Sequence, residues 1–277
     1  MRLASFLADG TACWGEVRGD RIVQAEGGDA TLLDFVRSGA VTPPPGREWA
    51  ASDVRLLPPL DVPEKIICVG VNYHDRNAEY RDGSAAPARP SLFFRTPGSL
   101  VGHGAPIERP RVSAQLDYEG EIALIVGRGG RHIAEDAALD HIFGATLCNE
   151  GSVRDWMRHG KFNVTQGKNF ERSGSIGPWI TTSDAVDLAR PLHLTTRVNG
   201  ELRQDETTAR MIFSFAALIA YISIFTTLRP GDVIVTGTPS GAGARSEPPR
   251  WLVAGDVVEV AVPELGVLRN TVREETS

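Results

Sequence analysis

Three glutamates near the middle of the chain have the residue type and spacing of a metal site. Glu119 and Glu121 stand two apart at the head of the apolar run GEIALIV, and Glu150 ends a second apolar stretch, GATLCNE. Side chains two apart on a strand point to the same face, so Glu119 and Glu121 are expected to project together. Two such carboxylates repel each other unless a cation lies between them. A hard divalent cation such as Mg²⁺ takes oxygen ligands, which leads to the hypothesis that the three glutamates form a metal site.

The alternative for this pair is a solvent-exposed face, which is the more common place for charged residues on a strand. The run IALIV leaves no alternating polar face, so a strand over 116–126 is expected to be covered on both sides. Glu150 stands at a second transition from apolar to polar sequence, beside Arg154 and ahead of Lys168. These two features favour a metal site. A lysine in a glycine-flanked loop is usually solvated, but Lys168 facing such a cluster would stabilise developing negative charge.

Several expected elements position these residues. The apolar run 65–73 is typical of a buried strand, and 152–160 is expected to form a helix directly after Glu150. Asn199–Gly200 indicates a hairpin with a type I′ turn. The sequence after 231 predicts a strand that runs into a glycine-rich loop, which lacks the phosphate-binding P-loop pattern.

A polar segment, 74–90, separates two buried strands and is expected to be either a functional lid or a plain loop. As a lid, it should be mobile until a ligand binds. Arg76 and Glu79 are three apart and would share one face of a helix, where a surface ion pair is the alternative.

Residues 1–59 are expected to form a small separate α/β unit without chemistry of its own, followed by a main domain over 60–277. Two short strand candidates, RLASFLA and RIVQAE, precede a short helix, ATLLDFVRS, that ends at a glycine. A proline-rich connection then leads to the main domain.

Composition narrows the class of protein. The chain has 277 residues and a formal charge of −6, without the basic stripe that nucleic-acid binding requires. Its three cysteines are widely spaced and are expected to be reduced, and no export signal opens the chain, so a cytoplasmic location is expected. Residues 211–228 lack charges and reach the minimum length of a membrane span, but a buried helix is favoured and no membrane partner is expected.

The sequence resembles the fumarylacetoacetate hydrolase family over about residues 62–273. The resemblance implies an α+β, mostly β fold, a mixed β-roll that usually forms a homodimer and binds Mg²⁺ or Mn²⁺. Eight ordered motifs carry it: VGVNY (69–73), DYEGEIALIVG (117–127), NEGSVRDW (149–156), GKNF (167–170), GPWI (177–180), RVNGELRQ (197–204), MIFSFAALIAYIS (211–223) and LRPGDVIVTGTPSG (228–241).

The resemblance also implies roles for individual residues. The metal ligands would be Glu119, Glu121 and Glu150. The remaining roles are catalytic for Glu79, Arg154 and Lys168, and substrate-binding for Thr238. Arg76 and Arg95 are also expected to bind substrate, although the family motifs do not supply these two residues.

Three positions depart from the family pattern. Glu150 stands where many members have aspartate, and its additional methylene adds about 1.5 Å of reach. Arg76 stands where hydrolytic members often have a lid histidine, and arginine cannot act as a general base because it stays protonated. Met157 stands where members often have glutamine, which removes a polar contact near the ligand.

The first functional hypothesis is a metal-dependent hydrolase that cleaves a C–C bond in an acylpyruvate or a related β-diketo 2-oxo acid. Hydrolysis needs a base that activates water, and Glu79 is the only obvious candidate. The alternatives are an isomerase or decarboxylase of 2-hydroxymuconate-type diacids from aromatic catabolism, which needs no activated water, and a catalytically idle metal-binding scaffold.

Overall fold

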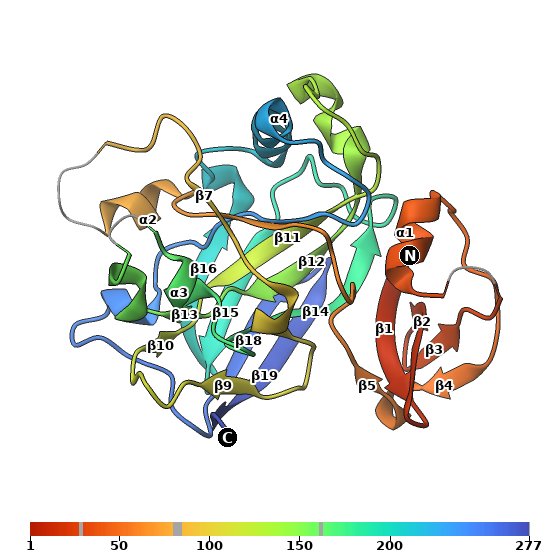
Figure 1. Ribbon diagram of the computed structural model, residues 1–277, viewed down its shortest axis with the longest axis horizontal. Coiled ribbons are helices and arrows are strands. Elements are labelled where there is room, and N and C mark those ends of the chain that lie inside the picture. The colour runs from red at the N-terminus through yellow and green to blue at the C-terminus, as the bar shows by residue number, and fades with distance from the viewer. Residues whose placement is uncertain (28–29, 80–84, 161–162, 277) are drawn as a thin grey trace.

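The computed structural model describes residues 1–27, 30–79, 85–160 and 163–276, and strands dominate this part of the chain (Figure 1). The α+β, mostly β fold expected from the sequence is confirmed. A twelve-stranded sheet forms its centre. Ten of its strands follow one path, in the order β4 (Glu48–Ala50), β3 (Arg21–Gln24), β2 (Thr11–Arg18), β1 (Arg2–Ala8), β14 (Gly174–Thr182), β12 (Ile142–Asn149), β11 (Gly120–Val126), β17 (Val233–Val235), β6 (Ile66–Val69) and β7 (Leu92–Phe94).

Two further strands join this sheet from the side, and two smaller sheets complete the β structure. β5 (Arg55–Leu56) pairs with β1, and β8 (Leu100–Val101) pairs with β14. A two-stranded sheet pairs β10 (Leu116–Asp117) with β13 (Ser152–Val153). A five-stranded sheet has the order β16 (Glu201–Thr207), β15 (His193–Val198), β18 (Val257–Val262), β19 (Gly266–Glu274) and β9 (Ile107–Arg109).

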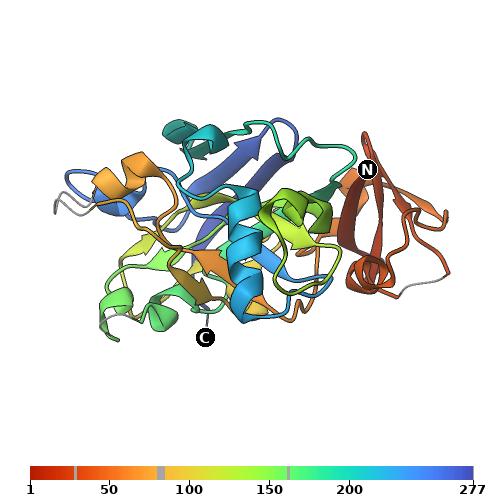
Figure 2. The same cartoon turned by 90° about the horizontal axis from the view of Figure 1, so that it is seen from above.

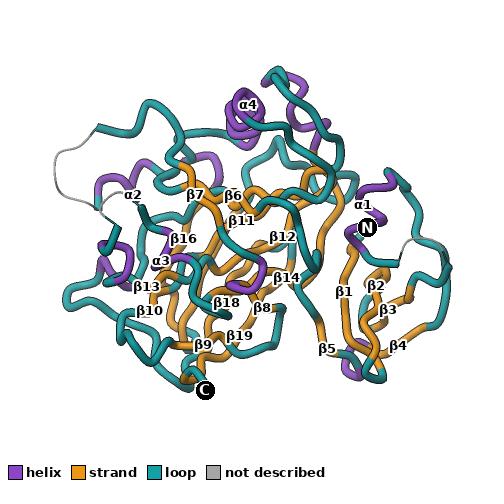
Figure 3. Tube along the Cα trace, in the orientation of Figure 1, coloured by secondary structure: helices purple, strands orange, loops and turns teal. Residues whose placement is uncertain are grey.

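The helices are short and lie around the sheets (Figure 3). The α-helices are α1 (Leu32–Ser38), α2 (His74–Ala78), α3 (Thr165–Lys168) and α4 (Phe215–Phe225). The 3₁₀ helices are η1 (Ala51–Asp53), η2 (Pro97–Ser99), η3 (Glu135–His141), η4 (Trp156–Arg158), η5 (Thr208–Arg210) and η6 (Gly243–Arg245).

Both faces of the central sheet are covered, as the uninterrupted apolar sequence of β11 predicts. Ile122 and Leu124 join a core that includes α4 and the inner face of the five-stranded sheet. Ala123 and Ile125, which point to the opposite face, join a second core that includes Trp14 of the N-terminal unit. A charged side chain at the end of β11 is therefore surrounded by protein.

The N-terminal residues lie at one side of the molecule in both ribbon views (Figures 1 and 2). The expected short strands and helix are present. In α1, the Thr31 side chain caps the amide of Asp34, and Gly39 ends the helix with a φ of 72°. The unit continues the central sheet, because β1 pairs with β14 at Arg2 and Leu3. The division into domains at residue 59 stays a prediction.

The predicted continuous strand over 116–126 is wrong, because two strands replace it. β10 leaves the central sheet to pair with β13, and the chain turns at Tyr118 and Glu119 before β11 begins. The buried Asp117 carboxylate holds this turn by accepting hydrogen bonds from the amides of Tyr118, Gly243 and Ala244.

The helix expected directly after Glu150 is also wrong. Ser152 and Val153 form β13 instead, and only the single turn η4 follows, capped by the Asp155 side chain. Pairing of β13 with β10 takes up the residues that would begin the helix.

The other expected elements are present. β15 and β16 form the hairpin, and Asn199 and Gly200 have the positive φ angles that a type I′ turn requires. The uncharged stretch 211–228 contains α4, a helix of 11 residues, and no helix in the described part of the chain is long and apolar enough to cross a membrane. Part of the expected lid, residues 80–84, lies outside the described residues.

Candidate active site

The three glutamates meet at one end of β11 and β12 and line one cavity of about 590 Å³. Glu121 begins β11 opposite Cys148, so Glu150 emerges from the neighbouring strand beside it. Glu119 arrives from the turn before β11, and its carbonyl accepts a hydrogen bond from the Glu150 amide at 2.7 Å. All three residues are at most 4% exposed. The sequence therefore predicted that the three residues lie together. It did not predict that Glu119 lies in the turn before β11, and not on the same strand as Glu121.

Lys168 lies between two of these carboxylates. Its Nζ is 2.5 Å from Glu119 Oε2 and 2.6 Å from Glu150 Oε2. Burial disfavours the charged form of Lys168, but attraction to Glu119 and Glu150 outweighs it and raises the pKa of the ammonium group. Lys168 therefore stays protonated, and it belongs to the short helix α3, not to a loop as expected.

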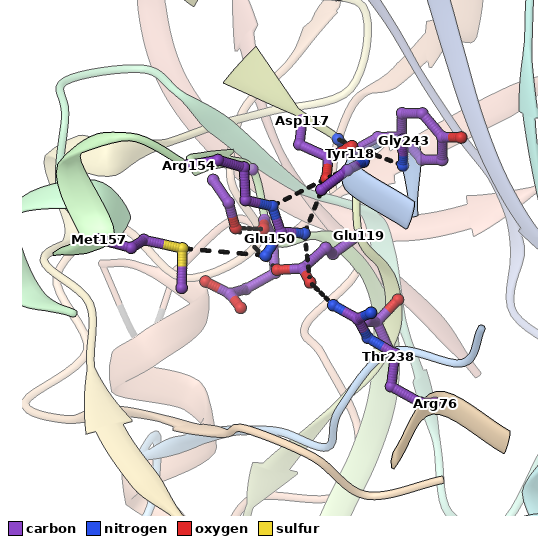
Figure 4. A network of polar contacts seen from close by, with 12 residues as sticks. Arg76, Asp117, Tyr118, Glu119, Glu150, Arg154, Met157, Thr238 and Gly243 are labelled. Atoms are coloured by element: carbon purple, nitrogen blue, oxygen red, sulfur yellow. Dashed lines mark hydrogen bonds and ion pairs between the residues drawn. The ribbon is translucent and has the colours of Figure 1, made fainter. Parts of the chain in front are cut away.

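Arg154 joins Glu119 to Asp117 (Figure 4). Its Nη2 is 2.8 Å from Glu119 Oε1, and its Nε donates to Asp117 Oδ2 at 2.8 Å. Burial opposes the charge, but attraction to Glu119 and Asp117 raises the pKa of the guanidinium. The same surroundings affect Glu119, where burial is outweighed by Arg154, Lys168 and Arg76, and its pKa lies well below the usual range.

Arg76 and Glu79 form the ion pair that their spacing on α2 suggests, and the pair is not at the surface. Arg76 is 3% exposed; its Nη1 is 2.7 Å from Glu79 Oε2, and its Nη2 is 3.3 Å from Glu119 Oε1. The other oxygen of Glu79 accepts a hydrogen bond from the Gly241 amide at 2.8 Å. Arg76 therefore connects the segment expected to be a lid to the acidic cluster.

Arg95 uses all five of its N–H groups within the protein. Its partners are Glu150 Oε1, the Gly151 carbonyl, the Ser173 hydroxyl, and the hydroxyl and carbonyl of Ser99. Arg95 lines the cavity, but it has no N–H left for the substrate contact expected from the sequence.

Thr238 also differs from expectation. Its hydroxyl donates to the Gly120 carbonyl at 3.0 Å and accepts from Gln204 Nε2 at 2.8 Å. The side chain is buried, and it is not among the described residues that line the cavity. In this structure Thr238 fixes the start of β11, and its expected contact with substrate stays a prediction.

Glu121 is the glutamate that lacks a cationic partner among the described residues. Its Oε2 accepts a hydrogen bond from the Gly237 amide at 2.5 Å. Burial, reinforced by the nearby Glu150 and Glu119 carboxylates, raises its pKa well above the usual range. A buried carboxylate of this kind is strongly stabilised by an added cation.

The residues fit a hard divalent cation. The donor set is three buried carboxylates, which is the oxygen chemistry that Mg²⁺ and Mn²⁺ take, and Glu121 needs a cation. Within the described ranges, however, no three acidic, histidine or cysteine side chains are already arranged as a metal centre. The Lys168 ammonium contacts oxygens of Glu119 and Glu150 that an ion would need.

Part of the cavity wall is apolar. Met157 and Phe93 border the charged residues: the sulfur of Met157 is 3.8 Å from Arg154 Nη1, and Lys168 Nζ lies 5.0 Å from the centre of the Phe93 ring. The apolar lining residues are Val69, Val71, Leu92, Phe93, Phe94, Met157 and Val164.

Sequence reasoning missed two groups that position the site. Asp117 holds both Arg154 and the loop after β17, and Ser152 donates to Glu119 Oε2 at 2.7 Å. An acid two residues before an E-x-E pair was the available signal for Asp117. Nothing in the sequence distinguishes Ser152 from an ordinary polar residue.

Comparison with known proteins places the chain in a family. Residues 65–273 match the model described as fumarylacetoacetate (FAA) hydrolase C-terminal, and residues 1–59 match the model described as Rv2993c-like, N-terminal. The chain belongs to the fumarylacetoacetate hydrolase family, which confirms the resemblance seen in the sequence.

Two relatives are oxaloacetate tautomerases. The mitochondrial oxaloacetate tautomerase fahd2 of Xenopus laevis is 41% identical over 80% of this chain and 69% of its own length. The oxaloacetate tautomerase YisK of Bacillus subtilis is 38% identical over 81% of this chain and 75% of its own length.

Solved structures give the same fold. A fumarylacetoacetate hydrolase from Exiguobacterium antarcticum superposes with a TM-score of 0.88 at 34% identity, covering 99% of this chain and 100% of that one. A 2-hydroxyhepta-2,4-diene-1,7-dioate isomerase from Mycobacterium marinum superposes with a TM-score of 0.83 at 31% identity, covering all of both chains. The expected fumarylacetoacetate-hydrolase-like fold is thereby confirmed.

Proposed function

We propose that this protein is an enzyme that interconverts the keto and enol forms of a small 2-oxo dicarboxylic acid of the oxaloacetate type. The observation that carries the proposal is the Arg76–Glu79 pair beside the cavity, where a hydrolase of the family often has a histidine–glutamate pair. None of the described residues that line the cavity is a histidine. The wall therefore offers the anion-binding guanidinium of Arg76, and the Glu79 carboxylate is bound to it but is not among the described residues that line the cavity. This pair suits binding and proton transfer better than activation of water. Similarity to oxaloacetate tautomerases supports the same choice.

The charge of the site supports an acidic substrate. With all groups ionised, the described cluster has five carboxylates and four basic side chains, an excess of one negative charge. One divalent cation reverses this excess and attracts an anion into the cavity. The groups counted are Glu79, Asp117, Glu119, Glu121, Glu150, Arg76, Arg95, Arg154 and Lys168.

Glu119, Glu121 and Glu150 would hold the divalent cation, Mg²⁺ or Mn²⁺, whose contribution when bound is to withdraw electrons from the 2-oxo group as a Lewis acid. The protein supplies the remaining parts. Lys168 and Arg154 stay protonated and stabilise the negative charge that develops on the substrate oxygen. Arg76 binds a substrate carboxylate and orients Glu79, which carries a proton to or from carbon.

Hydrolysis of an acylpyruvate, the first hypothesis from the sequence, is the second candidate. Glu79 favours it, because a carboxylate beside the cavity can also act on water, and so does similarity to a solved fumarylacetoacetate hydrolase. Against it, Arg76 stands where hydrolytic members of the family often have a histidine, and a guanidinium cannot act as a general base.

The experiment compares two substrates in the presence of Mg²⁺. We expect the enol absorbance of oxaloacetate to decay with enzyme far faster than without it, whereas acetylpyruvate is cleaved slowly or not at all. If the enzyme instead releases stoichiometric pyruvate from acetylpyruvate, with a kcat/KM higher than its kcat/KM for oxaloacetate, the protein is a hydrolase and not a tautomerase. No turnover of either substrate would leave the idle scaffold as the explanation.

A matched pair of variants tests the role of Arg76. Arg76→Gln should raise KM for oxaloacetate by a factor on the order of ten, the equivalent of one charge-assisted hydrogen bond. Arg210→Gln is the control, because Arg210 also pairs with an acid of α2, Asp75, but is half exposed. An equal effect of both substitutions would contradict the proposed role.

A further inference from the structure

We propose that Arg95 determines which divalent cation the site accepts, by holding Glu150 as a ligand with a single available oxygen. Arg95 is then a positioning residue that acts through Glu150 and does not touch the substrate. The inference rests on the proposed function only in taking Glu150 as a cation ligand.

The contacts of Arg95 leave it no other role in the cavity. Its side chain is fully buried, and its five N–H groups meet five acceptors at 2.7–3.3 Å. Four of these acceptors belong to Ser99, Gly151 and Ser173, which fix the guanidinium from several directions. The fifth is Glu150 Oε1, at 2.8 Å. A group held in this way cannot follow a substrate, but it can fix the carboxylate that it contacts.

The two oxygens of Glu150 are thereby divided. Oε1 faces the Arg95 guanidinium, and Oε2 faces the cavity, where it contacts Lys168 Nζ at 2.6 Å. A glutamate is one methylene longer than an aspartate and has more freedom to turn both oxygens toward an ion. The bond to Arg95 removes that freedom and presents one oxygen.

The other two glutamates show related restraints. Glu119 Oε1 accepts from Arg154 and Arg76, and Glu121 Oε2 accepts from the Gly237 amide. Each of the three carboxylates thus has at least one oxygen bound to a fixed protein donor, and Glu119 Oε2 also accepts from the Ser152 hydroxyl at 2.7 Å. At Glu150 Oε1 the donor is the Arg95 side chain alone, so one substitution can remove it.

Single-oxygen ligands suit small ions. Mg²⁺ requires near-octahedral coordination and keeps several waters, whereas Ca²⁺ takes 6–8 oxygens and often binds both oxygens of one carboxylate. A site made of three single-oxygen carboxylates therefore favours Mg²⁺ and Mn²⁺ over Ca²⁺. Freeing Glu150 Oε1 would give Ca²⁺ the additional oxygen.

The test measures cation binding without substrate. Protein freed of metal by a chelator is titrated with Mn²⁺ followed by electron paramagnetic resonance, and Mg²⁺ and Ca²⁺ are used as competitors. We expect the wild type to prefer Mg²⁺ to Ca²⁺. Arg95→Gln should raise the ratio of Ca²⁺ to Mg²⁺ affinity by roughly tenfold, the lower end of the effect of an outer-shell partner on metal binding. Arg95→Lys keeps one charged donor for Glu150 and should retain most of the wild-type ratio.

Two controls separate this role from a general loosening of the fold. Lys65→Met removes a different buried ion pair, Lys65–Asp232 at 2.9 Å, at the other end of β6, and should leave the ratio unchanged. In Arg95→Gln/Glu150→Gln, residue 150 has a single side-chain oxygen and no charge needs a partner, so the gain in Ca²⁺ affinity should disappear. The double variant also gives a readout if Arg95→Gln alone does not fold.

An unchanged ratio in Arg95→Gln, or a gain that persists in the double variant, overturns the inference. These outcomes are distinguishable from failure of the proposed function, because no substrate is present. A selective site without tautomerase activity would contradict the function alone, and tautomerase activity with an unselective site would contradict the inference alone.

Discussion

At the scale of single residues, the site is an arrangement of buried charges in which, among the described residues, every acid except Glu121 is paired with a basic side chain. Arg76 and Arg154 approach one oxygen of Glu119 (Figure 4). Lys168 joins the other oxygen of Glu119 to Glu150. Breaking one member of such a set leaves an uncompensated charge in the interior, which costs about 3–5 kcal/mol. Each of these side chains is therefore expected to contribute to stability as well as to chemistry.

A substitution of Glu79 tests whether this residue transfers the proton. Glu79→Gln keeps the size of the side chain and removes the carboxylate, so tautomerisation of oxaloacetate should fall by about 10²- to 10⁴-fold, the usual contribution of a general acid or base. Decarboxylation of oxaloacetate promoted by the cation needs no such proton relay and should be spared. Enol absorbance and CO₂ release, followed in parallel, measure the two reactions. Equal loss of both would remove Glu79 from the proton-transfer role.

The residue types of the site were predicted from the sequence, but their contacts were not. The E-x-E spacing, the apolar run after Glu121 and the apolar run before Glu150 indicated the acidic cluster. The sequence gives no measure of how many N–H groups of Arg95 or hydroxyl contacts of Thr238 are used inside the protein, because those partners lie far away along the chain. For that reason, both residues were expected to bind substrate.

At the scale of elements, the glycine-rich loop after β17 joins the parts of the site. Its backbone amides donate to three carboxylates: Gly237 to Glu121, Gly241 to Glu79, and Gly243 to Asp117. The loop lies so close to the backbone of β16 that a Cβ at position 241 would be 2.0 Å from the Arg203 carbonyl oxygen. The sequence predicted the loop, but not which acids it contacts.

Gly241→Ala tests this loop. The substitution creates a backbone clash and displaces the amide that holds Glu79, so we expect a large loss of kcat with a lowered Tm. Gly255→Ala is the matched control, because Gly255 has a similar φ, 95° against 97°, with no atom within 4 Å of a Cβ. The control should cost only about 1–2 kcal/mol of backbone strain and keep full activity. If the two variants have the same activity, the loop does not position the site.

The pairing of β6 with β17 depends on an ion pair at the end of the strands away from the cavity. Burial raises the pKa of Asp232, and Lys65 partly offsets this shift. Lys65→Met should destabilise the protein by about 3 kcal/mol at pH 7, because it leaves the Asp232 carboxylate buried and unpaired.

The sign of the pH dependence follows from that raised pKa. The folded state takes up a proton at Asp232 at a higher pH than the unfolded chain, so the penalty in Lys65→Met should shrink as pH falls toward about 4, the ordinary value for aspartate. Urea unfolding of the wild type and of Lys65→Met at several pH values measures this penalty. Lys65→Arg keeps the charge and should show a small penalty throughout. A loss in Lys65→Met that is constant with pH would contradict this account.

At the scale of the whole molecule, the N-terminal unit and the main body share a core. Trp14 is 2% exposed, lies 4.7 Å from Phe35 between ring centres, and belongs to the same cluster as Ile66 and Cys68. The sequence predicted the elements of this unit, but it could not predict the shared core, because β1 meets β14 about 180 residues later in the chain. The homodimer and the cytoplasmic location stay predictions.

Trp14→Ala should therefore destabilise the whole molecule and not the N-terminal unit alone. We expect a loss of about 3–5 kcal/mol, typical of a large aromatic removed from a core, within a single unfolding transition. Trp49→Ala, a partly exposed tryptophan of the same unit, is the control and should cost less. Urea unfolding followed by circular dichroism measures both. Two separate transitions, with only the first shifted by Trp14→Ala, would show that the two parts fold independently.

The proposed chemistry requires Glu119, Glu121 and Glu150 to hold one divalent cation together. Anomalous diffraction at the manganese edge, from crystals soaked with Mn²⁺ and oxalate, locates the ion directly. We predict one strong peak within coordination distance of an oxygen from each of the three glutamates, with Lys168 Nζ withdrawn from between Glu119 and Glu150. No peak at this position, with Lys168 still joining the two carboxylates, would contradict the central claim.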